Sequence, residues 1–229
     1  MKSVFPFSAV ILDMDGLLVD TEQLIHRMWA KAAADYGFTI PEAVYLTLVG
    51  TTRESTKLRL QAAMGADFPY DDICSKRDRY YEAHLEQFGI PVKQGAVELL
   101  EALNDAAVPC VLATSTRRTA ALRCLEKTGL HVYFSEIACG DEVERGKPAP
   151  DIFVLAANKA GAAPACCLVL EDSPAGIRAA FAAGMKCIMV PDIVPADAEL
   201  QTLSWRILPS LVDVKACLFD GHAQTAGEI

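Results

Sequence analysis

The sequence predicts an α/β fold, in which a parallel sheet carries helices and is interrupted after its first strand by a helical insertion. From residue 95 onward, apolar strand-like runs alternate with helical stretches of about 10–15 residues, which is typical of βαβ units with right-handed crossovers. Residues 20–90 show helical periodicity without a strand pattern. The 229 residues are enough to bury a sizeable core.

The first predicted strand covers residues 9–12 and ends in two carboxylates. Its continuous Ala-Val-Ile-Leu run is typical of a strand buried on both faces of a parallel sheet. Asp13 and Asp15 follow two residues apart, so both start from one side of an extended chain. Open α/β sheets build their sites at the carboxyl ends of strands. The pair is either part of such a site or an acidic loop cap, and the pattern leaves both open.

The insertion is expected to hold four helices, at residues 21–36, from about residue 41, at 53–64 and at 71–88. Gly37, Gly65 and Gly89 are natural stops for three of them. We therefore expect a helical domain at residues 20–92 and a sheet domain made of residues 1–19 and 93–229. In the sheet domain we expect strands at 109–113, 136–139, 166–170 and 187–190, with helices at 96–106, 117–128, 151–160, 174–183 and 208–218.

Composition excludes several function classes. The net charge of −9 argues against binding to nucleic acid or to an acidic membrane surface. No run reaches the ~18 apolar residues of a membrane span. The eight cysteines form no CxxC pair and several lie in apolar runs, where a free thiol behaves as a small hydrophobe. We expect a reduced, cytoplasmic protein that is a monomer or a weak homodimer.

Polar residues follow other predicted strands as well. Thr114 and Ser115 precede a helix start and could cradle phosphate or simply cap the helix. Glu171 and Asp172 follow another strand, where they could also serve as a capping run. Lys147 lies on a loop with two prolines, where a lysine is often merely solvated.

The coincidence of these signals is more informative than any one of them. If the four acidic residues converge, each like-charge pair at ~4 Å costs ~4 kcal/mol at an effective dielectric constant near 20, so the cluster needs a cation. An oxygen-only ligand set favours Mg²⁺ over zinc. With Lys147 and the Thr114 hydroxyl, this makes a pocket for a phosphoryl group. Dinucleotide, P-loop, serine-hydrolase and zinc-protease motifs are absent from the sequence.

Four motifs resemble the haloacid dehalogenase (HAD) superfamily, in its β-phosphoglucomutase-like branch. They are DMDGLLVDTE at 13–22, LATS at 112–115, GKPAPDIF at 146–153 and LEDSPAGIRAA at 170–180. They occur in the family's order and span nearly the whole chain. The resemblance implies a Rossmann-like core with helices on both faces of its sheet, and a small α-helical cap inserted after the first strand.

The resemblance also implies residue roles. Asp13 is similar to the nucleophile that forms an aspartyl-phosphate, and Asp15 to the general acid and base. Thr114 would hold the transferring group, and Lys147 would offset its charge. The implied Mg²⁺ ligands are Asp13, the backbone carbonyl of Asp15 and Asp172, with Glu171 nearby.

The cap loop Gly50-Thr51-Thr52-Arg53 resembles the family's specificity loop, so we expect Gly50 and Arg53 near the substrate, although Arg53 could equally be a solvated first-turn residue. We also expect Ser115, which follows Thr114 in the core, near the substrate. The mutases of this branch carry a histidine where this chain has Ile25. This difference favours a Mg²⁺-dependent phosphatase of a small sugar, polyol or nucleoside monophosphate. A phosphohexomutase and a non-catalytic phosphate-sensing or interaction module are the alternatives.

Overall fold

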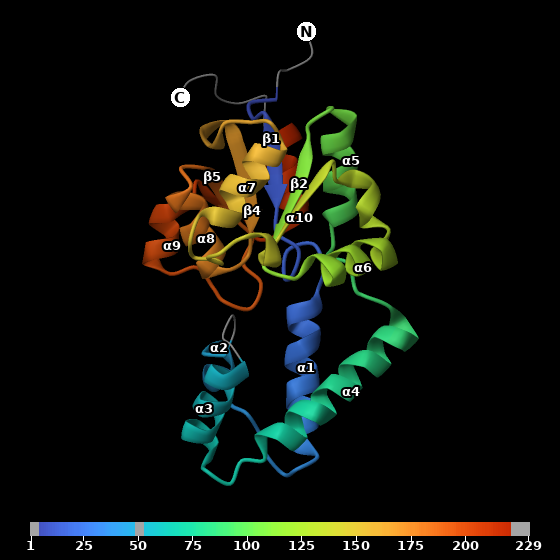
Figure 1. Cartoon of the computed structure of the whole chain (residues 1–229), viewed down its shortest axis with the longest axis vertical. Helices are drawn as coiled ribbons and strands as arrows, with labels where there is room; N and C mark the ends of the chain where they lie inside the picture. Colours follow the sequence, from blue (N-terminus) through green and yellow to red (C-terminus); the bar gives the residue numbers. More distant parts are fainter. Residues whose placement is uncertain (1–4, 49–52, 221–229) are drawn as a thin grey trace. The chain divides into compact units, whose positions relative to one another are not determined.

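The computed structural model describes residues 5–48 and 53–220, apart from the side chains of Arg53, Ser55 and Asp220. The chain divides into two compact units (Figure 1). The core unit comprises Met1–Asp20 and Pro91–Ile229, and the helical unit comprises Thr21–Ile90. The helical unit thus interrupts the core unit after the first strand. Its role as a substrate-selecting cap stays a prediction.

A parallel sheet of six strands, in the order β3-β2-β1-β4-β5-β6, forms the centre of the core unit. Strand β1 lies between β2 and β4, with Ile11 opposite Val111 and Val169. All four β1 side chains are buried. The strands are β1 (Ala9–Leu12), β2 (Cys110–Thr114), β3 (Glu136–Cys139), β4 (Cys167–Glu171), β5 (Lys186–Met189) and β6 (Arg206–Ile207).

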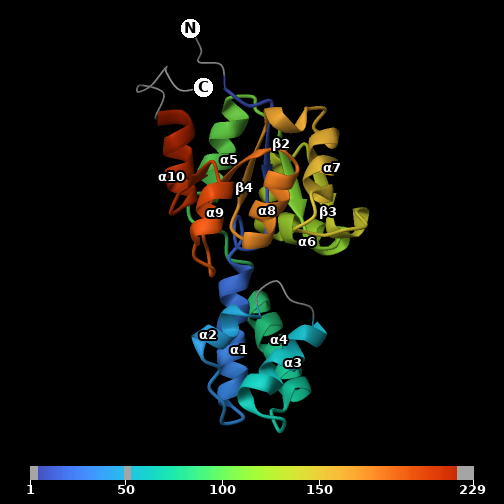
Figure 2. The ribbon, with the colours of Figure 1, turned by 90° about the vertical axis from the view of Figure 1, so that its left-hand side faces the viewer.

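Helices cover both faces of this sheet, as Figures 1 and 2 show for α7 and α8 on one face and α5 and α10 on the other. Ala9 and Ile11 of β1 share a buried apolar cluster with Phe153 of α7 and Ile177 of α8. The helices of the core unit are α5 (Ala96–Asp105), α6 (Arg118–Thr128), α7 (Asp151–Lys159), α8 (Pro174–Ala182), α9 (Ala198–Leu203) and α10 (Leu211–Lys215). This arrangement confirms the predicted α/β, Rossmann-like fold class.

The helical unit contains α1 (Thr21–Ala34), α2 (Glu42–Leu46), α3 (Arg53–Met64) and α4 (Tyr70–Phe88). Helix α1 packs along α4, and aromatic side chains contribute to the packing of the unit. The Trp29 and Tyr70 rings lie 5.9 Å apart, and Phe38 meets Phe68 edge-on at 5.0 Å. Within the described residues, no helix is long and apolar enough to cross a membrane.

The observed elements differ from the predicted ones mainly at polar strand ends. Strands β2 and β4 include Thr114 and Glu171, because these residues still pair with Cys139 and Met189 of the neighbouring strands. Helix α10 starts at Leu211 instead of residue 208, because the Ser210 side chain caps it. The sequence reasoning did not identify α9 and β6, which are short.

Candidate active site

Asp13 lies directly after the central strand β1, at the carboxyl edge of the sheet. Its backbone N–H donates to the carbonyl of Leu170 at 3.1 Å, which continues the pairing of β1 with β4 for one more residue. Only 6% of the residue is exposed. A carboxylate thus directly follows a fully buried strand, at the edge where open α/β sheets bind their ligands.

Lys147 reaches the same place from the loop between β3 and α7. Its ammonium donates to Asp13 Oδ1 at 2.5 Å, to Glu171 Oε1 at 2.6 Å and to the carbonyl of Ala113 at 3.3 Å. Burial alone would lower the pKa of this amine, but the charges of Asp13 and Glu171 outweigh burial and raise the pKa above its usual value. Lys147 is therefore a fixed positive charge in the site.

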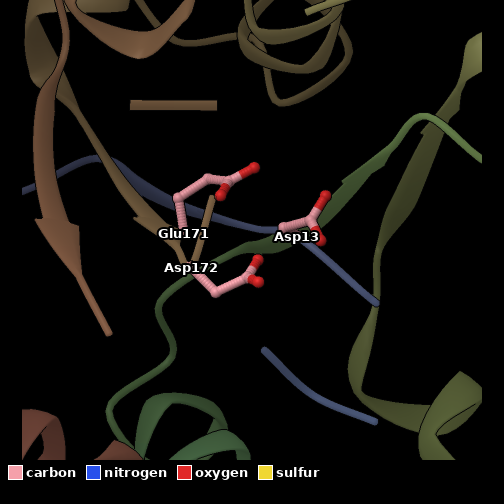
Figure 3. A group of neighbouring side chains, drawn as sticks. All are labelled: Asp13, Glu171 and Asp172. Carbon is pink, nitrogen blue, oxygen red and sulfur yellow. The ribbon is translucent and has the colours of Figure 1, made fainter. Parts of the chain in front are cut away.

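Asp13, Glu171 and Asp172 form a three-carboxylate cluster, in which one oxygen of each residue lies within 4.8 Å of the others. Figure 3 shows the three side chains gathered where β1 and β4 end. The pKa of Asp13 is raised to about 7, because burial, together with the charge of Glu171, outweighs the opposing effect of Lys147. Burial, followed by the charges of Glu171 and Asp13, also raises the pKa of Asp172 well above its usual range.

The charge of this cluster fits a divalent cation. Lys147 is the only cation paired with the cluster among the described residues, and it faces three buried carboxylates. Glu171 uses both oxygens within the protein, since Oε2 accepts from the Ser173 N–H at 2.5 Å. The oxygen-only donor set suits a hard ion such as Mg²⁺.

Two glycines allow the chain to pass close to these carboxylates. A Cβ at Gly176, in the first turn of α8, would lie 1.8 Å from Glu171 Oε1. A Cβ at Gly16 would lie 2.2 Å from Asp172 Oδ2, and Gly16 has a φ of +85°, which favours glycine. Gly16 and Gly176 therefore shape the site, a role that the sequence reasoning did not assign to them.

The Asp15 side chain does not join the three-carboxylate cluster and instead contacts Thr116. Its Oδ2 accepts a hydrogen bond of 2.8 Å from the Thr116 hydroxyl, and its carboxylate is outside the three-carboxylate cluster. The Thr116 N–H in turn donates to the buried Thr114 hydroxyl at 3.0 Å. Sequence reasoning assigned no role to Thr116, although it directly follows Thr114 and Ser115, for which a phosphate cradle and a helix cap were both left open.

The structure thus brings most of the predicted site residues to one edge of the sheet. These are Asp13, Asp15, Thr114, Lys147, Glu171 and Asp172. Ser115 is exposed beside Thr114. Gly50 lies outside the described residues, as does the side chain of Arg53, whose backbone begins α3. The expected substrate contacts of the cap loop therefore stay predictions.

The chain matches the family described as haloacid dehalogenase-like hydrolase over residues 10–190. It belongs to this family. The match spans the first strand, the helical unit and the core through β5, so the four motifs and the fold lead to the same assignment.

Several curated relatives of this HAD-like hydrolase are named as phosphatases. It is 34% identical to hexitol phosphatase A of Escherichia coli, over 82% of this chain and 83% of the relative. It is 32% identical to the bifunctional riboflavin kinase/FMN phosphatase of Arabidopsis thaliana, over 91% of this chain. The match spans about half of that longer relative, 54% of its length. The family match together with these relatives identifies the chain as a phosphoric monoester hydrolase.

Solved structures agree with this assignment. The chain superposes with a TM-score of 0.82 on a HAD family hydrolase from Deinococcus radiodurans, solved with bound phosphate and sodium. The two chains are 29% identical, and the superposition covers 97% of this chain and 100% of the other.

Proposed function

We propose that this protein is a Mg²⁺-dependent phosphatase that hydrolyses a small phosphorylated metabolite through an aspartyl-phosphate on Asp13. The observation that carries the proposal is the placement of Asp13, a buried carboxylate at the carboxyl end of the central strand, 2.5 Å from a lysine ammonium and beside two more carboxylates. A nucleophile for phosphoryl transfer needs this kind of fixed position and charge compensation.

The metal ligands would be Asp13, Asp172 and the backbone carbonyl of Asp15. Glu171 would orient Lys147, because its two oxygens already bind Lys147 and Ser173. When bound, the cation offsets the negative charge that the site and a phosphoryl group bring together.

The residues of this chain divide the reaction into two steps. A carboxylate oxygen of Asp13 attacks phosphorus, the ester P–O bond breaks, and Asp15 gives a proton to the leaving oxygen. A water then attacks the same phosphorus, the bond to Asp13 breaks, and Asp15 takes a proton from that water. Thr114 and Lys147 hold the phosphoryl oxygens during both steps.

The names of the relatives support the proposed substrate class. Relatives carry the names hexitol phosphatase and FMN phosphatase, so a sugar, polyol or nucleoside monophosphate is the proposed substrate. Gly50, Arg53 and Ser115 are the proposed substrate contacts, with the helical unit as the cap that selects the substrate.

A phosphate-release screen over phosphorylated metabolites tests this proposal. The wild-type protein with Mg²⁺ should release phosphate from members of these classes, and Asp13→Asn should release none. Absence of Mg²⁺-dependent release from a broad panel would instead favour a non-catalytic phosphate-sensing module.

A mutase reaction is the outcome that would change the assignment within the family. Ile25 stands where the branch's mutases have a histidine, and the next residue, His26, is engaged inside the helical unit. His26 stacks on Tyr45 at 3.8 Å and its Nε2 lies 3.2 Å from Glu42. With glucose 1-phosphate and a trace of bisphosphate, we expect free phosphate to form faster than glucose 6-phosphate. The reverse order would identify a phosphohexomutase.

Metal binding can be tested without activity. Mg²⁺ should raise the melting temperature of the wild-type protein, since a ligand that binds only the folded state stabilises it. Asp172→Asn should weaken this effect, whereas Asp35→Asn in the helical unit should leave it unchanged. An equal Mg²⁺ response in all three proteins would rule out the three-carboxylate cluster as the metal site.

A further inference from the structure

We infer that Thr116 is the positioning residue for Asp15, the proposed general acid and base. This inference rests on the proposed function. The Thr116 hydroxyl donates to Asp15 Oδ2 at 2.8 Å, a contact between residues 101 positions apart in the chain. The two residues meet because β1 and β2 are neighbouring parallel strands whose carboxyl ends lie at the same edge.

Thr116 is itself firmly held. Its N–H donates to Thr114 Oγ1 at 3.0 Å, and its carbonyl accepts from the Gly140 N–H at 3.1 Å. Gly140 packs so closely on this turn that a Cβ there would lie 2.1 Å from the Ser115 carbonyl oxygen. The turn after β2 is therefore fixed by the residues after β3, and Thr116 offers its hydroxyl from a defined position.

These bonds also set the direction of two hydroxyl protons. Thr114 Oγ1 accepts from Thr116, so the hydrogen of Thr114 is available to donate to a phosphoryl oxygen. Thr116 donates to Oδ2 of Asp15, so the same residue fixes the position of one oxygen of the proposed acid. One residue thereby organises both the phosphoryl-binding hydroxyl and the acid.

Positioning of this kind has a definite chemical consequence. The terminal torsion of an aspartate is broad, so a single well-placed donor narrows the orientations that the carboxyl group samples. General acid catalysis is worth about 10²–10⁴-fold, and it depends on the acid lying within hydrogen-bond reach of the leaving oxygen. General acid catalysis matters most for leaving groups that are unstable as anions.

The experiment compares two aryl phosphates of similar size with Mg²⁺ present. The nitrophenolate of para-nitrophenyl phosphate leaves readily without being protonated. The phenolate of phenyl phosphate is a poorer leaving group and depends more strongly on protonation. Thr116→Val should lower kcat on phenyl phosphate by about tenfold or more and on para-nitrophenyl phosphate by about threefold or less. KM should change little on either. Thr116→Ser keeps the hydroxyl and should restore both rates.

Controls separate this role from a purely structural one. Thr202→Val removes a hydroxyl that donates to a carbonyl within α9 at 3.0 Å, so it makes the same chemical change away from the site. It should leave both rates unchanged. Thr116→Ala provides a second variant without the hydroxyl if Thr116→Val unfolds, as judged by thermal melting.

The outcomes are distinct. An equal fall in kcat on both esters in the folded Thr116→Val or Thr116→Ala protein, or no fall on either, would overturn the role of Thr116 while leaving the phosphatase proposal intact. Failure of the wild-type protein to release phosphate from both of these esters and from the metabolite panel would overturn both.

Discussion

The core unit and the helical unit each contain a lysine paired with a carboxylate, and the two pairs behave in opposite ways. In the core unit, the side chains of Lys147 and Asp13 are 6% and 8% exposed, and the pKa of Asp13 is raised to about 7. In the helical unit, the side chains of Lys76 and Asp35 are 30% and 35% exposed, and the pKa of Asp35 is lowered. The lysine lowers the carboxylate pKa in both pairs, but burial outweighs the lysine in the core unit.

The two carboxylates differ in pKa because they differ in solvent exposure and in the number of carboxylates that share each lysine. Asp35 accepts from Lys76 at 2.7 Å and from the Tyr80 hydroxyl at 2.5 Å, in an arrangement that water also reaches. The pair in the core unit is desolvated and shares its lysine with a second carboxylate, so repulsion remains uncompensated. A cluster that is costly to keep charged is typical of a functional site, whereas an exposed pair contributes little to stability.

The largest expected effect concerns the nucleophile. Asp13→Asn should lower turnover by on the order of 10³-fold or more, because the amide cannot form the phosphoryl intermediate. The same change in the helical unit, Asp35→Asn, should leave turnover within about twofold of wild type, since exposed-site changes are usually minor. Steady-state phosphate release by both variants measures the contrast. Substantial residual turnover in Asp13→Asn would mean that another residue is the nucleophile.

The next effect concerns the two lysines. Lys147→Met should destabilise the protein by about 3–5 kcal/mol, because it leaves buried carboxylates without their cation. Lys76→Met should change stability far less, because its partner can be solvated. Chemical denaturation without metal compares them, and added Mg²⁺ should restore part of the loss in Lys147→Met. Equal destabilisation by both substitutions would contradict the comparison.

A smaller effect is expected where the chain passes the buried carboxylates. Gly176→Ala should cost about 1–3 kcal/mol, because its Cβ would overlap the Glu171 side chain. Gly146→Ala is the matched control, since a Cβ there meets nothing within 4 Å. Thermal or chemical unfolding of the two variants checks this. A neutral Gly176→Ala would show that Glu171 can move aside.

The smallest expected effect is the pH-dependent contribution of Asp35 to stability. Hydrogen bonds from Lys76 and then Tyr80 hold the pKa of this carboxyl below its usual value. Its contribution to stability is therefore present above the ordinary carboxyl pKa and is lost as the pH falls through the lowered pKa. Asp35→Asn should shift the melting temperature slightly at neutral pH, less at high salt, and not at all in strong acid. A larger shift in acid would reverse the assigned sign.

The sequence by itself determined the elements and the chemistry at their ends. The apolar run before Asp13 is buried on both faces of the sheet, which is why it is readable as a central strand. The observed α3 has the predicted bounds, Arg53–Met64. Because carboxyl ends of parallel strands share one edge, residues as distant as Asp13 and Glu171 could be predicted to meet. Strand β6, of two residues, is too short for a periodicity signal.

Only the tertiary structure decided how these residues divide their contacts. Strand order places β1 between β2 and β4, so Asp13 shares Lys147 with Glu171 while Asp15 turns to Thr116. Spacing along the chain carries no information about such partners, because side-chain orientation at a strand end depends on the neighbouring loops. The raised pKa of Asp13 likewise depends on burial by the whole core, which no local pattern records.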